Sequence, residues 1–246
     1  DSQLITIDGK VMAVAFMANT QHLYVRTDVL KENGIAIPKT YEEVVAASEK
    51  IRAAGKMKYP YAAAYKAGWN LAEEFVNMYI GHGGEFFKAG TAKPNVNNAK
   101  GVATLNMLKK LADLSNPDYL THDSEAIKVE WEAGNVAIMT LWASRSGTLL
   151  DDEGDAKITA ATKLVAPATV GGGNIPAATL WWDGFTLAKN RSDADAEASF
   201  RAMAHAASSK EMVAKAADQA VWLVEGFVPG PKSVGVIEAV KMGAKP

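Results

Sequence analysis

The sequence predicts an α/β fold with a largely parallel sheet, and three observations support this prediction. Short apolar runs, typical of buried strands, alternate with segments whose apolar residues recur every three to four positions, as in amphipathic helices. Glycines and capping motifs separate many of these segments. No internal repeat or low-complexity segment interrupts the alternation. Strands that alternate with helices favour a parallel sheet covered by helices.

Each expected element is assigned from its own local signal. Strands are expected at residues 11–18, 23–26, 59–65, 136–141, 158–165 and 180–188. Helices are expected at residues 28–33, 40–55, 70–81, 99–114, 124–133, 193–207 and 210–219. Polar residues 19–22 separate the first two strands, and Thr40 with Glu43 forms a capping box that opens the second helix. The three glycines within residues 167–176 make that segment the best candidate for a linker.

The helix at 99–114 is expected to present one apolar face to the core. Its inward residues are predicted to be Val102, Leu105, Leu108 and Leu111, which recur at helical spacing. The helix at 124–133 ends at Gly134 and carries a tryptophan that is expected to be buried.

Composition excludes several classes of function. The chain has 246 residues, of which 48% are hydrophobic and 22% charged, as in ordinary globular proteins. The formal charge of −2 and the scattered basic residues predict no general attraction to nucleic acid or to an anionic membrane. The absence of cysteine excludes disulfides and thiolate chemistry. No apolar stretch is long enough for insertion into a membrane.

Residues 1–8 do not form a signal peptide, so either the protein is cytoplasmic or its N-terminus has been removed. The motifs described below favour removal. Common catalytic signatures are also missing, because the chain has no G-x-S-x-G, H-E-x-x-H or P-loop motif. Its four histidines are too far apart in sequence to suggest a metal site, and no cofactor motif is present.

The tryptophans carry the strongest functional signal. They are Trp69, Trp131, Trp142, Trp181, Trp182 and Trp222. Trp131 lies within a predicted helix and is expected in the core. In contrast, Trp69 lies between a strand and a helix, Trp142 ends a strand shortly before Arg145, and Trp181 precedes Asp183 just after the glycine-rich segment. These positions place aromatic rings beside polar side chains at the ends of strands.

A carbohydrate site needs this combination of side chains. A sugar ring offers apolar C–H faces that pack on a flat aromatic ring, and hydroxyl groups that bind polar side chains. In open α/β sheets, ligands bind outside the carboxyl ends of the strands. The sequence therefore indicates a binding site for a saccharide or polyol.

Five segments resemble motifs of one protein family, in the same order along the chain. They are residues 8–15 (DGKVMAVA), 23–30 (LYVRTDVL), 34–43 (GIAIPKTYEE), 131–139 (WEAGNVAIM) and 226–229 (GFVP). The family is that of the family 1 extracellular solute-binding proteins of ABC importers, which includes maltose-binding-protein-like sugar receptors. The segment at 34–43 is the most specific of the five.

The resemblance implies a periplasmic-binding-protein-like fold, in which hinge strands join two α/β lobes around a ligand cleft. It also implies that the N-terminal part of one lobe and the final helices are missing from this chain, so that the ligand would bind weakly. The implied division is a remnant of the N-terminal lobe at 1–17, the C-terminal lobe at 18–165, the returning part of the N-terminal lobe at 166–220, and a hinge with the start of the return to the C-terminal lobe at 221–246.

The function implied by the resemblance is that of a periplasmic receptor rather than an enzyme. It would bind a small neutral saccharide or polyol and deliver it to the permease subunits of an ABC importer, without a cofactor or metal. The implied ligand-binding residues are Asn19, Thr20, Trp69, Trp142, Arg145, Trp181, Trp182, Asp183, Trp222 and Glu225. An alternative is a glycan-active hydrolase that uses Asp183 and Glu225 as its two carboxylates.

Overall fold

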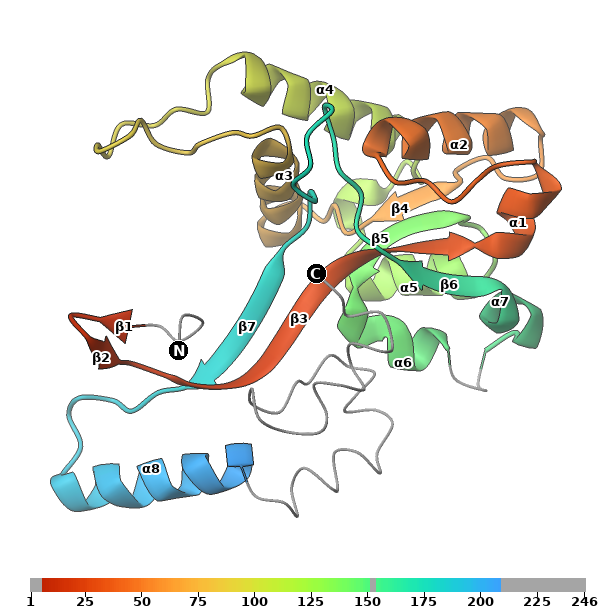
Figure 1. The fold of residues 1–246 in the computed structure, drawn as a ribbon. Helices are drawn as coiled ribbons and strands as arrows, with labels where there is room; N and C mark the ends of the chain where they lie inside the picture. Colours follow the sequence, from red (N-terminus) through yellow and green to blue (C-terminus); the bar gives the residue numbers. More distant parts are fainter. Residues whose placement is uncertain (1–5, 151–153, 209–246) are drawn as a thin grey trace. The chain divides into compact units, whose positions relative to one another are not determined.

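The computed structural model describes residues 6–150 and 154–208 (Figure 1). The chain divides into two compact units, of which unit 1 comprises Asp1–Thr20 and Leu180–Pro246, and unit 2 comprises Gln21–Thr179. The chain passes from unit 1 to unit 2 within strand β3 (Val14–Arg26) and returns between Thr179 and Leu180.

In the described part of unit 1, the regular elements besides the first half of β3 are β1 (Thr6–Ile7), β2 (Lys10–Val11), β7 (Leu180–Phe185) and α8 (Asp193–Ser208). The strands of unit 2 are the second half of β3, β4 (Tyr61–Ala63), β5 (Ile138–Trp142) and β6 (Thr162–Val165). Its helices are α1 (Thr27–Glu32), α2 (Tyr41–Ala53), α3 (Trp69–Gly81), α4 (Ala99–Asp113), η1 (Tyr119–Thr121), α5 (Ser124–Glu132), η2 (Ala143–Arg145), α6 (Ser146–Leu149) and α7 (Ala156–Ala161).

The sheet of unit 2 has the strand order β4-β5-β3-β6, and the prediction of a largely parallel sheet is wrong for it. Only β4 and β5 form a parallel pair, whereas β3 is antiparallel to both β5 and β6. It follows that β4, β5 and β6 all run in one direction. Strand β3 runs in the opposite direction and lies between β5 and β6, so its pairings with both of these strands are antiparallel.

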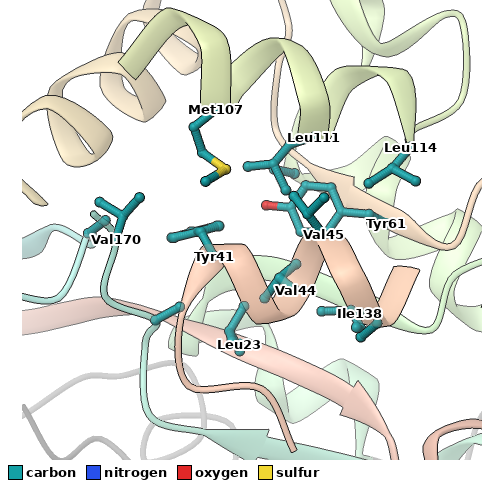
Figure 2. Close-up of a cluster of buried hydrophobic side chains, with 14 of the residues drawn as sticks. Leu23, Tyr41, Val44, Val45, Tyr61, Met107, Leu111, Leu114, Ile138 and Val170 are labelled. Atoms are coloured by element: carbon teal, nitrogen blue, oxygen red, sulfur yellow. The ribbon is translucent and has the colours of Figure 1, made fainter. Parts of the chain in front are cut away.

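The two faces of this sheet bury alternate residues of each strand, as the period of two in a strand requires. On β3, Leu23 and Val25 belong to one core cluster, and Tyr24 between them belongs to the other. The first cluster is completed by α2, α3 and α4, and Figure 2 shows side chains from α2 and α4 meeting over the sheet. The second is completed by α5, α6 and α7. Unit 2 is therefore a sheet with helices on both faces, which confirms the α/β class.

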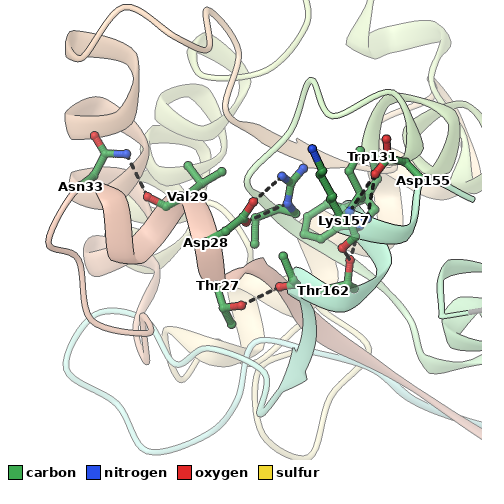
Figure 3. Close-up of polar contacts among 11 residues, drawn as sticks. Thr27, Asp28, Val29, Asn33, Trp131, Asp155, Lys157 and Thr162 are labelled. Carbon is green, nitrogen blue, oxygen red and sulfur yellow. Dashed lines mark hydrogen bonds and ion pairs between the residues drawn. The ribbon is translucent and has the colours of Figure 1, made fainter.

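Local signals define several helix starts as predicted. Thr40 caps α2 by accepting a hydrogen bond from the Glu43 backbone N–H at 3.1 Å, while the Glu43 carboxylate accepts from the Lys39 N–H at 2.6 Å. At the C-terminal end of β3, the Asp28 carboxylate accepts two hydrogen bonds from the Arg26 guanidinium, at 2.9 and 2.7 Å (Figure 3). This guanidinium lowers the pKa of Asp28.

Residues 166–179 belong to unit 2, which corrects the predicted boundary at 165 and the expectation of a linker. Thr169 exchanges backbone hydrogen bonds with the segment before α2, donating to Lys39 at 3.0 Å and accepting from Tyr41 at 2.8 Å. Val170 and Ala177 are buried against α3, where their side chains leave room only for a glycine at position 81. The glycine-rich segment is therefore a packed loop of unit 2.

Two other expected boundaries also change. Residues 11–18 and 23–26 were expected to be separate strands with a lobe boundary at 17, but β3 runs continuously from Val14 to Arg26 and the units divide after Thr20. Residues 158–165 were expected to be one strand, but their first part completes helix α7 and only Thr162–Val165 forms β6. The predicted helix at 210–219 and the segment 221–246 lie outside the described residues. Among the described residues, no helix has the length and apolar character needed to cross a membrane.

Candidate functional site

The predicted site residues in the described part of unit 1 lie on a ribbon formed by β3 and β7. The two strands are antiparallel, with Asn19 opposite Trp181 and Met17 opposite Asp183. Directly opposed residues share a face of an antiparallel pair, and so do residues two apart on one strand. Asn19, Trp181 and Asp183 therefore lie on the same face. We call these three residues the ribbon face.

Within the ribbon face, the indole Nε1–H of Trp181 donates a hydrogen bond to Asp183 Oδ1 at 3.0 Å. The Trp181 residue is 41% exposed, and Asn19 and Asp183 are half-buried. The hydrogen bond restrains the ring, and the second carboxylate oxygen of Asp183 can accept a further hydrogen bond beside it. Thr20 and Trp182 occupy the alternate register positions, opposite Leu180 and Ala18.

The predicted site residues of unit 2 lie at one edge of its sheet. Because β4 and β5 are parallel neighbours, their carboxyl ends meet at the same edge. Trp69 begins α3, the helix that follows β4, and Trp142 is the last residue of β5. Trp69 is 56% exposed, so its ring is accessible in this unit.

Trp142 and Arg145 have structural partners within unit 2. Trp142 is only 9% exposed and packs in the second core cluster, which favours a structural role for its indole. The Tyr24 hydroxyl donates to the Trp142 carbonyl at 2.9 Å and shares a hydrogen bond with Ser146 at 2.8 Å, so this turn is held on β3. Arg145 forms an ion pair with Glu125.

A buried polar group at the same edge was not predicted. It consists of the buried Gln21, Glu74 and Asn77 together with the half-buried Thr179, and we call these four residues the crossing cluster. Burial raises the pKa of Glu74 to about 8, and burial also raises the pKa of its neighbour Glu73. The signal available in the sequence was this pair of adjacent carboxylates in a mostly apolar helix.

The remaining expectations concern residues that the structure does not describe or groups that it does not contain. Trp222 and Glu225 lie outside the described residues. The carboxylate pair of the hydrolase alternative includes Glu225, so the structure does not describe that pair either. Within residues 6–150 and 154–208, no group of three or more His, Asp or Glu side chains is placed to hold a metal ion.

Comparison with known proteins identifies relatives over most of the chain. Residues 3–214 match the family model described as bacterial extracellular solute-binding protein. A probable ABC transporter-binding protein of Deinococcus radiodurans is 32% identical over 193 residues, which cover 75% of this chain and 44% of that protein. The chain thus spans less than half the length of this curated relative.

Solved structures with the same fold include proteins crystallised with sugars or polyols. A maltose-bound protein of T. maritima superposes with a TM-score of 0.78 at 21% identity, over 93% of this chain and 56% of that one. A solute-binding protein of Agrobacterium vitis with bound D-mannitol gives 0.77 at 18% identity, over 97% of this chain and 57% of that one. A solute-binding protein of Agrobacterium radiobacter in complex with ribitol superposes with a TM-score of 0.74 at 19% identity, over 91% of this chain and 54% of that one. These likenesses establish the two-lobe binding-protein fold, of which this chain spans somewhat more than half.

Proposed function

The chain belongs to the family of bacterial extracellular solute-binding proteins, and on this basis we propose that it binds a neutral saccharide or polyol and delivers it to an ABC importer. In this proposal the ribbon face is the binding surface of unit 1, and Trp69, taken by itself, is a binding residue of unit 2. Its location would be the periplasm, and its partners would be the permease subunits of the importer.

The observation that carries the proposal is the ribbon face. An exposed indole whose N–H is fixed by a carboxylate offers a flat apolar surface with polar groups at its margin. A sugar or an alditol presents the complementary pattern of C–H and hydroxyl groups. The three solved structures with the same fold bind maltose, D-mannitol and ribitol, which supports a ligand of this class.

Charge supports a neutral ligand. On the ribbon face, the one ionisable side chain is Asp183, and it already accepts the Trp181 N–H. A ligand phosphate beside this carboxylate would be repelled. The family match supports a receptor rather than the hydrolase alternative with Asp183 and Glu225, since the family is one of solute-binding proteins.

Saturation-transfer difference NMR on the chain tests the proposal with maltose, D-mannitol and ribitol as probes, because it detects weak as well as tight binding. We expect signals from at least one of the three, and none from glucose 6-phosphate or spermidine. Trp181→Ala should weaken that binding by about 1–3 kcal/mol, which is roughly a 5- to 150-fold loss of affinity.

Phe200→Ala is the matched control, because Phe200 is a 49% exposed aromatic residue of α8 in the same unit but outside the ribbon face. It should leave binding unchanged. Binding of only the phosphate or the polyamine would contradict the neutral-ligand proposal. Equal affinity of the Trp181→Ala variant and the parent chain would exclude the ribbon face as the site.

A further inference from the structure

The two chain crossings between the units are joined to each other inside unit 2. Gln21 is the first residue of this unit, and Thr179 is the last. The Gln21 backbone N–H donates to the Thr179 carbonyl at 3.2 Å. This hydrogen bond therefore ties the two crossing points to each other within unit 2.

The side chains of the crossing cluster form a hydrogen-bonded series with a single direction. The Thr179 hydroxyl donates to Asn77 Oδ1, and Asn77 Nδ2 donates to Gln21 Oε1 at 2.6 Å. Gln21 Nε2 then donates to Glu74 Oε1 at 2.7 Å. Gln21, Glu74 and Asn77 are each less than 5% exposed, with values of 2%, 3% and 4%. Such a series is cooperative, so water that enters it and replaces one of its bonds weakens the others.

Glu74 terminates the series, and among the described residues no cationic side chain acts on its pKa. Glu73 on the same helix acts on the pKa of Glu74, and the charge of Glu74 in turn raises the pKa of three neighbouring tyrosines, which are Tyr41 on α2, Tyr61 on β4 and Tyr65 after β4. A fully buried, unpaired carboxylate is costly, so the neutral form is favoured. Its raised pKa, about 8, agrees with this geometry. At neutral pH Glu74 therefore carries a proton.

We propose that the crossing cluster is a lock that fixes both crossing strands to α3, and that ionisation of Glu74 in mildly alkaline solution opens it. In the closed lock, neutral Glu74 accepts the Gln21 amide and completes the series. When the proton leaves, the carboxylate still accepts the Gln21 amide, but its negative charge is buried beside Glu73 with no compensating cation among the described residues. The cluster must then admit water, and both strands lose their attachment to α3. This proposal does not depend on the ligand proposed above.

The proposal determines how stability should depend on pH. A glutamate in the unfolded chain has its ordinary pKa of 4.5, whereas folded Glu74 has a pKa of about 8. The folded state therefore binds one more proton between these values, and the chain loses stability through Glu74 as pH rises from 4.5 to 8. Below pH 4.5 and above pH 8 this dependence ends.

Glu74→Gln tests the lock, because glutamine keeps the acceptor for Gln21 and stays neutral. The melting temperatures of the variant and the parent should be equal near pH 4.5. The variant should become progressively more stable than the parent as pH rises to about 8, with no further divergence beyond it. Glu49→Gln, at an exposed position of α2, removes the same charge and should show no such divergence.

Hydrogen exchange in the parent chain provides a test that does not require the variant to fold. Protection factors, which correct for the intrinsic pH dependence of exchange, should fall by about tenfold per pH unit between about pH 5 and 8. The fall should occur at residues 19–23 and 177–181. A variant that is less stable than the parent at every pH, or protection of these segments that does not change with pH, would overturn the proposal.

Discussion

Replacement of Trp131 by alanine should lower the free energy of unfolding of unit 2 far more than a substitution at its surface. Trp131 is fully buried, and its ring packs edge-on against Tyr24 with 6.3 Å between centroids and 72° between planes. Its Nε1–H donates to Thr162 Oγ1 at 3.0 Å (Figure 3). We therefore expect a loss of about 3–5 kcal/mol in the free energy of unfolding, as for other buried tryptophans.

The structure indicates why this loss should not be larger. Thr162 also donates its hydroxyl to the Ile158 carbonyl at 2.7 Å, so it keeps a partner when the indole is removed and no buried polar group is orphaned. The expected loss corresponds to a decrease in melting temperature of about 2–4 °C per kcal/mol for a chain of this size. Trp131→Phe keeps an aromatic ring beside Tyr24 and should lose only about 1–2 kcal/mol.

Urea unfolding followed by far-UV circular dichroism measures these differences as shifts of the midpoint at constant slope. Val129→Ala is the control, because Val129 lies on the same helix but is 62% exposed, and it should change stability by no more than about 0.5 kcal/mol. If Trp131→Ala costs less than the control, the assignment of Trp131 to the core is refuted.

Three further substitutions test other parts of the structure by the same unfolding measurement. Trp142→Ala should cost about 3 kcal/mol, because the indole is 9% exposed and belongs to the second core cluster; a fully stable variant that no longer binds sugar would restore Trp142 to the ligand site. Trp181→Ala should cost less than about 1 kcal/mol, because the residue is 41% exposed and belongs to neither core cluster, and a larger loss would make it a core residue. Gly101→Ala should cost about 1–3 kcal/mol although alanine favours helices, because its Cβ would lie 2.0 Å from the Val96 carbonyl oxygen; a gain in stability would contradict this close contact.

Elements with strong local signals were predicted almost to the residue. The helix expected at 70–81 is Trp69–Gly81, and the one expected at 124–133 is Ser124–Glu132. The second of these carries Trp131, and its predicted burial is confirmed. Helical periodicity and end signals depend on neighbouring residues, so sequence alone suffices for them.

The inward face of α4 was predicted only in part. Leu108 and Leu111 are buried as expected, but Val102 and Leu105 are 56% and 59% exposed. Gly101 and Thr104 are buried in their place, because the first turn of the helix lies directly against the carbonyl of Val96. Hydrophobicity identifies an apolar stripe, but a close backbone approach selects small residues instead, and this approach is a tertiary feature.

The polar residues 19–22 show most clearly why the remaining features could not be predicted from the sequence alone. They were interpreted as a break between two strands, because polar side chains are rarely buried in the middle of a sheet. In the structure the strand continues through them, with Gln21 and His22 almost fully buried. Their partners are Glu74, Asn77 and the Val165 carbonyl, at separations of 53, 56 and 143 residues along the chain. A polar residue is tolerated in a core only when such partners are present, and the topology that supplies them cannot be inferred from the residues nearby. The same dependence on distant partners makes this part of β3 the place where one proton on Glu74 can control the attachment of both crossing strands.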